Sequence, residues 1–163
     1  MKRRIKHVTV LGSGIMGSGI AAHFANIGVE VLLLDIVPFE LTEAEQKKGL
    51  TKEDKAVRNR IATESLAKLV KASPALLYKK EFAERISVGN FDDDLQKIKN
   101  TDWIIEVVVE RLDIKKSVYE KIEQFRKPGT LVSSNTSGIP INMLVEGRSD
   151  DFKKYFAGTH FFN

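Results

Sequence analysis

The string "GSGIMG" places glycines at positions 12, 14 and 17, and it constrains the fold of this chain more than any other feature. It follows a short β-branched run, "HVTVLG" at 7–12, which predicts a strand buried on both faces. Apolar residues at helical spacing come next, and "EVLLLDI" at 30–36 predicts a second strand. The first 36 residues therefore predict a βαβ unit whose glycines lie in the turn between strand and helix.

The rest of the chain continues to alternate strands with helices. Four further apolar runs predict strands: "RISVGN" at 85–90, "WIIEVVV" at 103–109, "TLVSSN" at 130–135 and "YFAGTHFF" at 155–162. Apolar residues from Ile114 to Phe125 recur at helical spacing and predict a helix between two of these strands. This alternation predicts an α/β fold with a Rossmann-type, doubly wound and mainly parallel sheet, in one domain over residues 1–163.

A helical excursion is expected at about residues 39–85. Apolar residues form only a narrow stripe there, and the stretch from Thr51 to Asp54 approximates a capping box. The stripe consists of Val57, Ile61, Leu66 and Leu69. We therefore expect long, charge-rich helices that protrude after the second strand and stand partly clear of the core. The stretch from 55 to 71 contains five basic residues and only one acidic residue, and the simplest interpretation of these charges is a solvated helix face.

Composition excludes several classes of protein. The chain has no cysteine, which excludes a disulfide scaffold, a thiolate nucleophile and a cysteine-ligated metal site, and we expect no bound metal. No apolar stretch approaches the ~20 residues of a membrane helix, and glycines interrupt the run that follows the basic start, so we expect a cytoplasmic protein without a signal peptide. The net charge of +4 is spread through mixed-sign segments, which argues against a nucleic-acid partner.

The glycine string also predicts a ligand. In this context Gly12 permits a tight turn, Gly14 lets a pyrophosphate approach the backbone, and Gly17 lets helix and strand pack closely. Free amides at the start of the helix attract phosphates, so Ile15 and Met16 in the same turn are further candidate contacts. The sequence therefore predicts a dinucleotide site at this turn.

Asp35 indicates which dinucleotide is bound. It ends the second predicted strand, 23 residues after Gly12, where a carboxylate can accept hydrogen bonds from the adenosine ribose hydroxyls. The same carboxylate would repel a 2′-phosphate, so NAD is expected rather than NADP. The alternative is that Asp35 is only a solvated acid at a strand end.

Four segments together resemble a known family. They are, in order, "VTVLGSGIMGSGIA", "IIEVVVERLDIKK", "SSNTSGIPI" and "FAGTHFFN". In this order and spacing they resemble the NAD-binding domain of the 3-hydroxyacyl-CoA dehydrogenases, and the resemblance spans essentially all 163 residues. "SNTS" combined with "HFFN" is its most specific part. The resemblance implies oxidation of 3-hydroxyacyl-CoA to 3-ketoacyl-CoA with NAD, as in fatty-acid β-oxidation.

The resemblance also assigns roles to single residues. His160 matches the family's general base, and imidazole suits that role because it both accepts and donates a proton near neutral pH. Ser137 matches the serine that hydrogen-bonds the reacting oxygen, and Asn135 and Asn163 match polar residues near the nicotinamide and the substrate. Without the resemblance, His160 would read as a structural residue of an apolar strand, and the serine and asparagines as turn residues.

Further positions match contacts made by the cofactor and by coenzyme A. Glu110 and Lys115 match contacts around the nicotinamide half of NAD, although an exposed ion pair at the start of a helix is the alternative. Ser65, Lys68 and Lys71 match the part of the excursion that meets coenzyme A. Glu106 lies inside a predicted buried strand and needs partners that the sequence does not identify.

The resemblance further implies parts that lie beyond this chain. In the family, a glutamate after "HFFN" orients the histidine, and a C-terminal helical domain completes the acyl pocket and usually the dimer. We therefore expect a cofactor domain of a longer, homodimeric or multidomain enzyme, which by itself is monomeric and inactive. Two alternatives stay open: an NAD-dependent dehydrogenase of free 3-hydroxy acids, and a nucleotide-binding module without catalytic activity.

Overall fold

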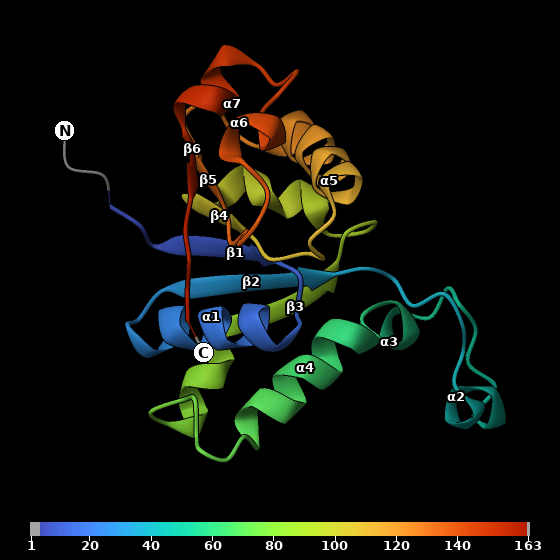
Figure 1. Ribbon diagram of the computed structural model, residues 1–163. Helices are drawn as coiled ribbons and strands as arrows, with labels where there is room; N and C mark the ends of the chain where they lie inside the picture. Colours follow the sequence, from blue (N-terminus) through green and yellow to red (C-terminus); the bar gives the residue numbers. More distant parts are fainter. Residues whose placement is uncertain (1–3, 163) are drawn as a thin grey trace.

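The computed structural model describes residues 4–162, in which parallel strands form one central sheet (Figure 1). The strands are β1 (His7–Leu11), β2 (Glu30–Asp35), β3 (Ile86–Asn90), β4 (Trp103–Glu106), β5 (Leu131–Ser134) and β6 (Phe156–Gly158). Their spatial order is β3-β2-β1-β4-β5-β6, and every neighbouring pair is parallel. This is the doubly wound order of a Rossmann-type sheet, so the expected fold class is confirmed.

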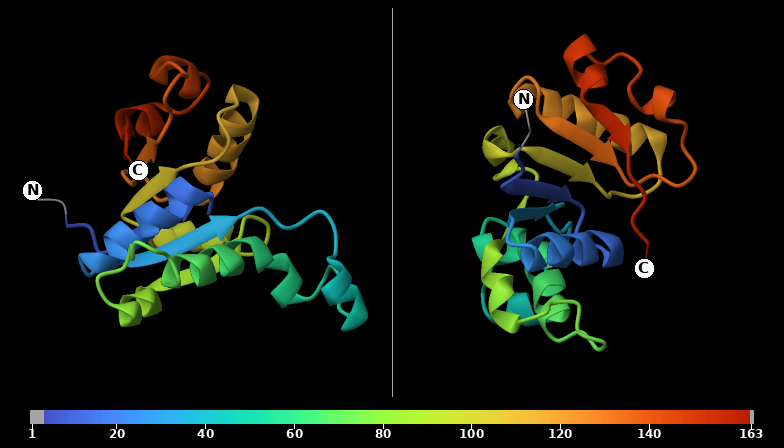
Figure 2. Two further views of the ribbon diagram at one scale, coloured as in Figure 1. Left: turned by 60° about the horizontal axis from the view of Figure 1, so that its bottom comes forward. Right: turned by 90° about the vertical axis from the view of Figure 1, so that its left-hand side faces the viewer.

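Helices cover both faces of the sheet and bury a core on each (Figure 2). The α-helices are α1 (Ile15–Asn26), α2 (Glu43–Lys47), α3 (Lys55–Arg58), α4 (Arg60–Val70), α5 (Leu112–Phe125), α6 (Ile141–Leu144) and α7 (Asp150–Lys154), and the 3-10 helices are η1 (Lys80–Arg85) and η2 (Leu95–Asn100). One core joins α1 and α4 to the sheet, and the other joins α5, α6, α7 and η2 to it. Within residues 4–162 no helix has the length and apolar character needed to cross a membrane.

The register of the strands places the functional segments along one edge of the sheet. Leu11 pairs with both Leu34 and Glu106, so Gly12, Asp35 and Val107 are the next residues of three adjacent strands. Glu106 pairs with Ser134, and Ser134 pairs with Gly158, so residues 135 and 159 extend the same row. The carboxyl ends of all these strands therefore meet where ligands bind in doubly wound folds.

The helical excursion differs from the prediction in one respect. Long helices that stand partly clear of the core were expected, but the excursion is divided into α2, α3 and α4, and only the segment around α2 stands away from the body (Figures 1 and 2). α4 has 11 residues and lies against the sheet, with Leu69 buried and Leu66 packed on the same core. The narrow apolar stripe attaches this helix to the sheet while its other side remains in solvent, so α4 stands partly clear of the core as expected, but it is shorter than a long helix.

Capping also differs at the start of the excursion. The complete capping box belongs to α2, where Thr42 and Glu45 bond each other's backbone amides, and the sequence reading missed it. At the predicted position, the Asp54 side chain does accept hydrogen bonds from the amide and the hydroxyl of Thr51. A capping box also needs the amide of Asp54 to bond the Thr51 hydroxyl, but this amide bonds the Thr51 carbonyl instead.

The last strand is shorter than the sequence indicated. A strand was expected over 155–162, but β6 ends at Gly158. The amide of Thr159 still bonds the carbonyl of Ser134, and beyond it the chain leaves the sheet, so the amide of Phe161 bonds the side chain of Asn135 instead. His160 consequently lies past the end of the strand and is exposed.

Two glycines fix the turn between β1 and α1. Gly12 has φ +105°, and a Cβ there would lie 2.6 Å from the carbonyl oxygen of Val107. A Cβ on Gly17 would lie 1.8 Å from the carbonyl oxygen of Gly12. Any larger residue at either position would therefore push α1 or the end of β4 away from the turn.

We predict that Gly17→Ala lowers the free energy of unfolding by at least about 2 kcal/mol, because the added methyl group meets backbone that cannot move aside. Gly19→Ala, two residues along the same helix, is the matched control. Nothing lies within 4 Å of a Cβ on Gly19, so alanine there should stabilise the protein by up to about 1 kcal/mol through its helix propensity. Urea unfolding measures both changes, and equal effects of the two substitutions would contradict the clash.

Candidate active site

A cleft opens at the carboxyl ends of β1, β2 and β4. It has a volume of about 730 Å³, and its walls include Gly12, Gly14, Asp35, Phe39 and Val109. A Cβ on Gly14 would meet nothing within 4 Å, so the turn leaves open space where a phosphate would approach the backbone. A carboxylate, an open glycine turn and apolar walls together fit the adenosine half of a dinucleotide.

The Asp35 carboxylate is held in place at the wall of this cleft. Its Oδ2 accepts hydrogen bonds from the amide and the hydroxyl of Ser13, each at 2.6 Å, and its Oδ1 accepts the amide of Ile36 at 2.7 Å. These bonds tie the end of β2 to the glycine turn, so the carboxylate is oriented without a ligand. The sequence reading missed Ser13, although it lies inside the glycine string.

Ser137 and His160 line a second hollow at the same edge of the sheet. This hollow has a volume of about 430 Å³ and lies between the segment 136–141, which follows β5, and residues 158–160 at the end of β6. Both side chains are exposed, and the rings of His160 and Phe162 pack edge to face at 4.8 Å. The structure thus brings together the two residues that the sequence proposed for catalysis, and the imidazole is available to a ligand.

Asn135 and Asn163 are the two asparagines predicted to lie near the nicotinamide and the substrate. The Asn135 side chain accepts the amide of Phe161 at 2.8 Å and so holds the segment that carries His160. Asn163 lies outside the described residues, and its contact with the cofactor or substrate stays a prediction.

Glu106 is fully buried and has the partners that the sequence could not name. Its carboxylate accepts hydrogen bonds from Lys115 Nζ at 2.7 Å, Tyr119 Oη at 2.5 Å and Ser134 Oγ at 2.6 Å. The amide of Val108 donates a further bond at 2.8 Å. Burial and the adjacent carboxylate raise the pKa of Tyr119, so its hydroxyl stays protonated and donates. Sequence reasoning missed Tyr119 and Ser134, although Tyr119 lies one helical turn after Lys115.

Lys115 connects this buried charge to the loop that carries Ser137. Its ammonium lies 2.7 Å from Glu106 and 3.1 Å from Glu110, and its side chain is only 1% exposed. The exposed ion pair considered as an alternative is therefore wrong for Lys115. Its contact with a cofactor stays a prediction, because the ammonium is already engaged by two carboxylates.

Glu110 holds the loop itself. It accepts hydrogen bonds from the Thr136 hydroxyl, and from the amides of Ser137 at 3.0 Å and Gly138 at 3.1 Å. Partial burial acts to raise the pKa of Glu110, but these bonds and that from Lys115 outweigh it and lower the pKa to about 2. Glu110 is therefore ionised at neutral pH and fixes the backbone next to Ser137.

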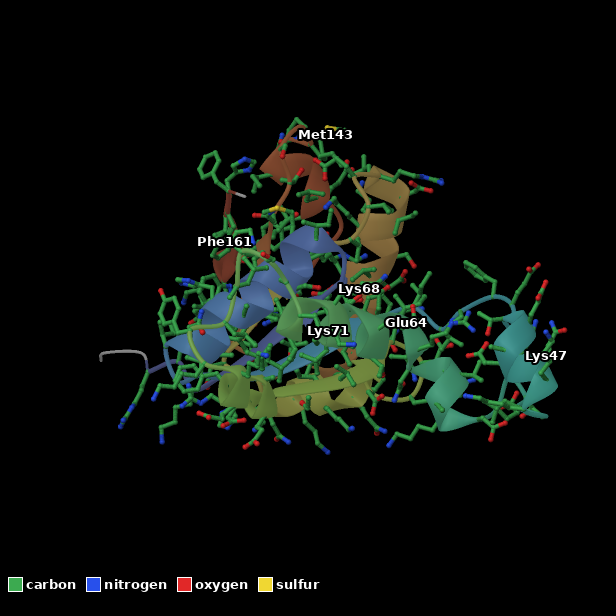
Figure 3. All side chains as sticks on the ribbon, turned by 90° about the horizontal axis from the view of Figure 1, so that it is seen from below. Lys47, Glu64, Lys68, Lys71, Met143 and Phe161 are labelled. Atoms are coloured by element: carbon green, nitrogen blue, oxygen red, sulfur yellow. The ribbon has the colours of Figure 1, made fainter. Side chains whose placement is uncertain are left out.

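The residues predicted to meet coenzyme A divide into two groups. Ser65 and Lys68 line a cavity of about 330 Å³ together with Ser13 and Gly14, on the side of the glycine turn that faces α4. Figure 3 shows Lys68 at the edge of α4 next to the first turn of α1. Lys71 follows α4 on its exposed surface and does not line this cavity.

The strand order, the glycine turn and the carboxylate at the end of β2 define a dinucleotide-binding domain of the Rossmann type. A family model described as "3-hydroxyacyl-CoA dehydrogenase, NAD binding domain" matches residues 7–163, and the chain belongs to this family. The resemblance seen in the sequence is thereby confirmed, and with it NAD as the cofactor.

Named relatives agree with this assignment. The chain is 55% identical, over its whole length, to a probable 3-hydroxyacyl-CoA dehydrogenase of Bacillus subtilis (strain 168), and covers 21% of it. It is 43% identical, over 98% of its length, to a protein of the same description from Deinococcus radiodurans, and covers 42% of it. The chain therefore spans less than half of either relative.

Among solved structures, 3-hydroxybutyryl-CoA dehydrogenase from Escherichia coli K12 superposes with a TM-score of 0.75 at 25% identity, over 99% of this chain and 30% of that one. The (S)-3-hydroxybutyryl-CoA dehydrogenase PaaH1 from Ralstonia eutropha gives a TM-score of 0.68 at 30% identity, over 98% of this chain and 50% of that one.

We predict that Glu106→Gln lowers the free energy of unfolding by about 3 kcal/mol, because a buried ammonium then loses a charged partner. Lys115→Met should also destabilise the fold, and the double variant should be less destabilised than the sum of the two by at least about 1 kcal/mol. Glu120→Gln, on an exposed position of α5, is the control and should stay within about 0.5 kcal/mol of the parent protein. Additive effects in denaturant unfolding would mean that the two charges do not stabilise each other.

We also predict that the chain binds NADH at least about tenfold more tightly than NADPH, because Asp35 would repel a 2′-phosphate. Asp35→Ser should narrow this gap, whereas Asp113→Ser, which removes an acid from another wall of the same cleft, should preserve it. Calorimetric titration with both nucleotides gives the comparison. Equal affinities in the parent protein would show that Asp35 does not distinguish the two cofactors.

Proposed function

We propose that this domain belongs to an enzyme that oxidises L-3-hydroxyacyl-CoA to 3-ketoacyl-CoA, a step of fatty-acid β-oxidation. The observation that carries the proposal is the hollow that Ser137 and His160 share at the carboxyl edge of the sheet. The strand register puts this hollow in one row with the glycine turn and Asp35. A base and a hydroxyl group are therefore available at the edge where the dinucleotide binds.

In the proposed reaction His160 acts as the general base. Its imidazole takes the proton of the substrate's 3-hydroxyl, and the C3–O bond becomes a carbonyl as the C3 hydrogen leaves with its electron pair. Bound NAD supplies the acceptor for this hydride. In the reverse direction the protonated imidazole returns the proton to the oxygen.

Ser137 orients the reacting oxygen in this proposal. Its hydroxyl is exposed in the same hollow, while its backbone amide is bonded to Glu110. The backbone around Ser137 is therefore held without use of the hydroxyl, which stays available to the substrate. Such positioning matters because a hydrogen bond to the reacting oxygen fixes the substrate relative to the base.

The cofactor and coenzyme A are assigned to the two sides of the glycine turn. The amides from Gly14 to Gly17 bind the pyrophosphate, because those of Gly12 and Ser13 are already bonded to the Leu34 carbonyl and to Asp35. Asp35 accepts the ribose hydroxyls. Ser65 and Lys68, in the cavity beside α4, provide a hydroxyl and an ammonium group for the phosphates of coenzyme A. Lys71, on the exposed surface after α4, adds a second ammonium group outside this cavity. A relative from Rickettsia felis, 39% identical, is described as a putative fatty acid oxidation complex trifunctional enzyme, which supports a multidomain parent.

The test uses a full-length protein that carries this domain. His160→Gln should lower kcat for 3-hydroxyacyl-CoA by at least about two orders of magnitude, because glutamine can hydrogen-bond but cannot take up the proton. The affinity for NADH should stay within about threefold, since His160 lies outside the adenosine cleft. The 163-residue chain by itself should bind NADH without measurable turnover.

His7→Gln is the matched control, because His7 is an exposed histidine at the opposite end of β1 and should leave kcat unchanged. Near-normal turnover in His160→Gln would remove His160 from the reaction. Turnover of free 3-hydroxy acids in place of the thioester would favour the first alternative enzyme, and NADH binding without turnover of either in the full-length protein would favour a non-catalytic module.

A further inference from the structure

We propose that the hydroxyl of Ser13 couples the nucleotide cleft to the cavity beside α4. In this coupling, a nucleotide bound at Asp35 strengthens the binding of a phosphate group at Ser65 and Lys68. The inference rests on the proposed function for the identity of its two ligands, NADH and coenzyme A. It adds a regulatory connection between their sites.

Two cavities meet at the glycine turn. The nucleotide cleft, at the carboxyl ends of β1, β2 and β4, is lined by Asp35. The smaller cavity beside α4 is lined by Ser65 and Lys68, and Gly14 lines both. Ser13 lies between them and is only 2% exposed. Its Oγ lies 2.6 Å from Asp35 Oδ2 and 3.1 Å from Ser65 Oγ. One buried hydroxyl thus touches a polar group of each cavity.

The number of protons on these groups fixes the direction of the hydrogen bonds. A serine hydroxyl donates once, and the shorter bond to a charged carboxylate takes the proton of Ser13. Ser13 is also the donor in the longer contact with Ser65, so Asp35 and Ser65 compete for its single proton. Without a nucleotide, Asp35 therefore holds this proton, and the oxygen of Ser65 does not receive it.

A ribose changes this arrangement because Asp35 has few free acceptor positions. Its two oxygens offer about four lone pairs. Three of them already receive the amides of Ser13 and Ile36 and the hydroxyl of Ser13. Two ribose hydroxyls therefore need one of these donors to leave. The amides are fixed by the backbone, whereas the hydroxyl of Ser13 rotates, so the hydroxyl turns toward Ser65.

This rotation completes the hydrogen bond from Ser13 to Ser65. A hydroxyl that accepts a hydrogen bond is itself a stronger donor, so Ser65 then bonds an anion in the cavity beside α4 more strongly. Lys68 lies one helical turn after Ser65, on the same side of α4, and adds a positive charge. The hydrogen bond from Ser65 to a phosphate is thus stronger when the nucleotide is bound.

Calorimetry on the 163-residue chain tests the coupling by binding alone. Coenzyme A is titrated first by itself, and NADH is then titrated with and without saturating coenzyme A. We expect the Kd of NADH to fall at least about threefold in the presence of coenzyme A, and the reciprocal titration must give the same factor. Pantetheine, which lacks the phosphates, should leave the Kd of NADH unchanged.

Ser13→Ala and Ser65→Ala should each reduce this factor to about one, and the double variant should show no further change, because both serines act in one relay. Ser65→Thr retains a hydroxyl and should retain the coupling. Thr63→Ala removes a hydroxyl from an exposed position of the same helix and should also retain it. If Ser13→Ala does not fold, the comparison of Ser65→Ala with Ser65→Thr shows whether the coupling between the two ligands needs the hydroxyl at position 65.

The outcomes separate this inference from the proposed function. Coupling that persists in Ser65→Ala, or a weaker affinity for NADH when coenzyme A is present, would overturn the relay but leave coenzyme A recognition intact. A chain that binds NADH but no coenzyme A would overturn the assignment of coenzyme A to α4, and the relay with it.

Discussion

The buried carboxylate of Glu106 is the interaction on which the active-site edge depends. An isolated carboxylate in a protein interior costs several kcal/mol, so every lone pair must find a donor. Here the donors come from the backbone after β4, from two turns of α5 and from the end of β5. The hydrogen bonds to this one charge therefore fix the positions of β4, α5 and β5 relative to one another. The end of one of these strands cannot move without breaking bonds to the others.

The same charge organises the surface through Lys115 and Glu110. Burial decreases from Glu106, whose side chain is fully buried, through Lys115 to Glu110, whose side chain is 42% exposed. Because the pKa of Glu110 is lowered to about 2, its bonds to the Ser137 loop contribute stability above its usual pKa of 4.5. That contribution is lost as the pH falls toward 2. The loop is thus anchored from the interior throughout the neutral and mildly acidic range.

Local sequence signals predicted most of the fold but less of the site. The glycine string and the apolar runs predicted the sheet, because their spacing reports backbone geometry directly. The burial of Lys115 was not predictable, because it depends on Glu106, which is nine residues away and lies on another element. Likewise, "YFAGTHFF" has the composition of a strand throughout, but the end of β6 is set by where the edge of β5 stops offering partners. The hydrogen bond between Ser13 and Ser65 joins residues 52 positions apart, and no local pattern reports such a pairing.

The capping box of α2 has a consequence for how this domain can diverge. None of the five residues of α2 is buried, and Thr42, Glu45 and Arg60 satisfy one another within the excursion. The segment is therefore self-supporting and is attached to the sheet instead of being built into it. Insertions, deletions and exchanges of charge can accumulate there without disturbing strand register, since surface segments tolerate changes in length at small entropic cost. Natural variation can thus remodel the rim of the domain while the chemistry at the sheet edge remains constant.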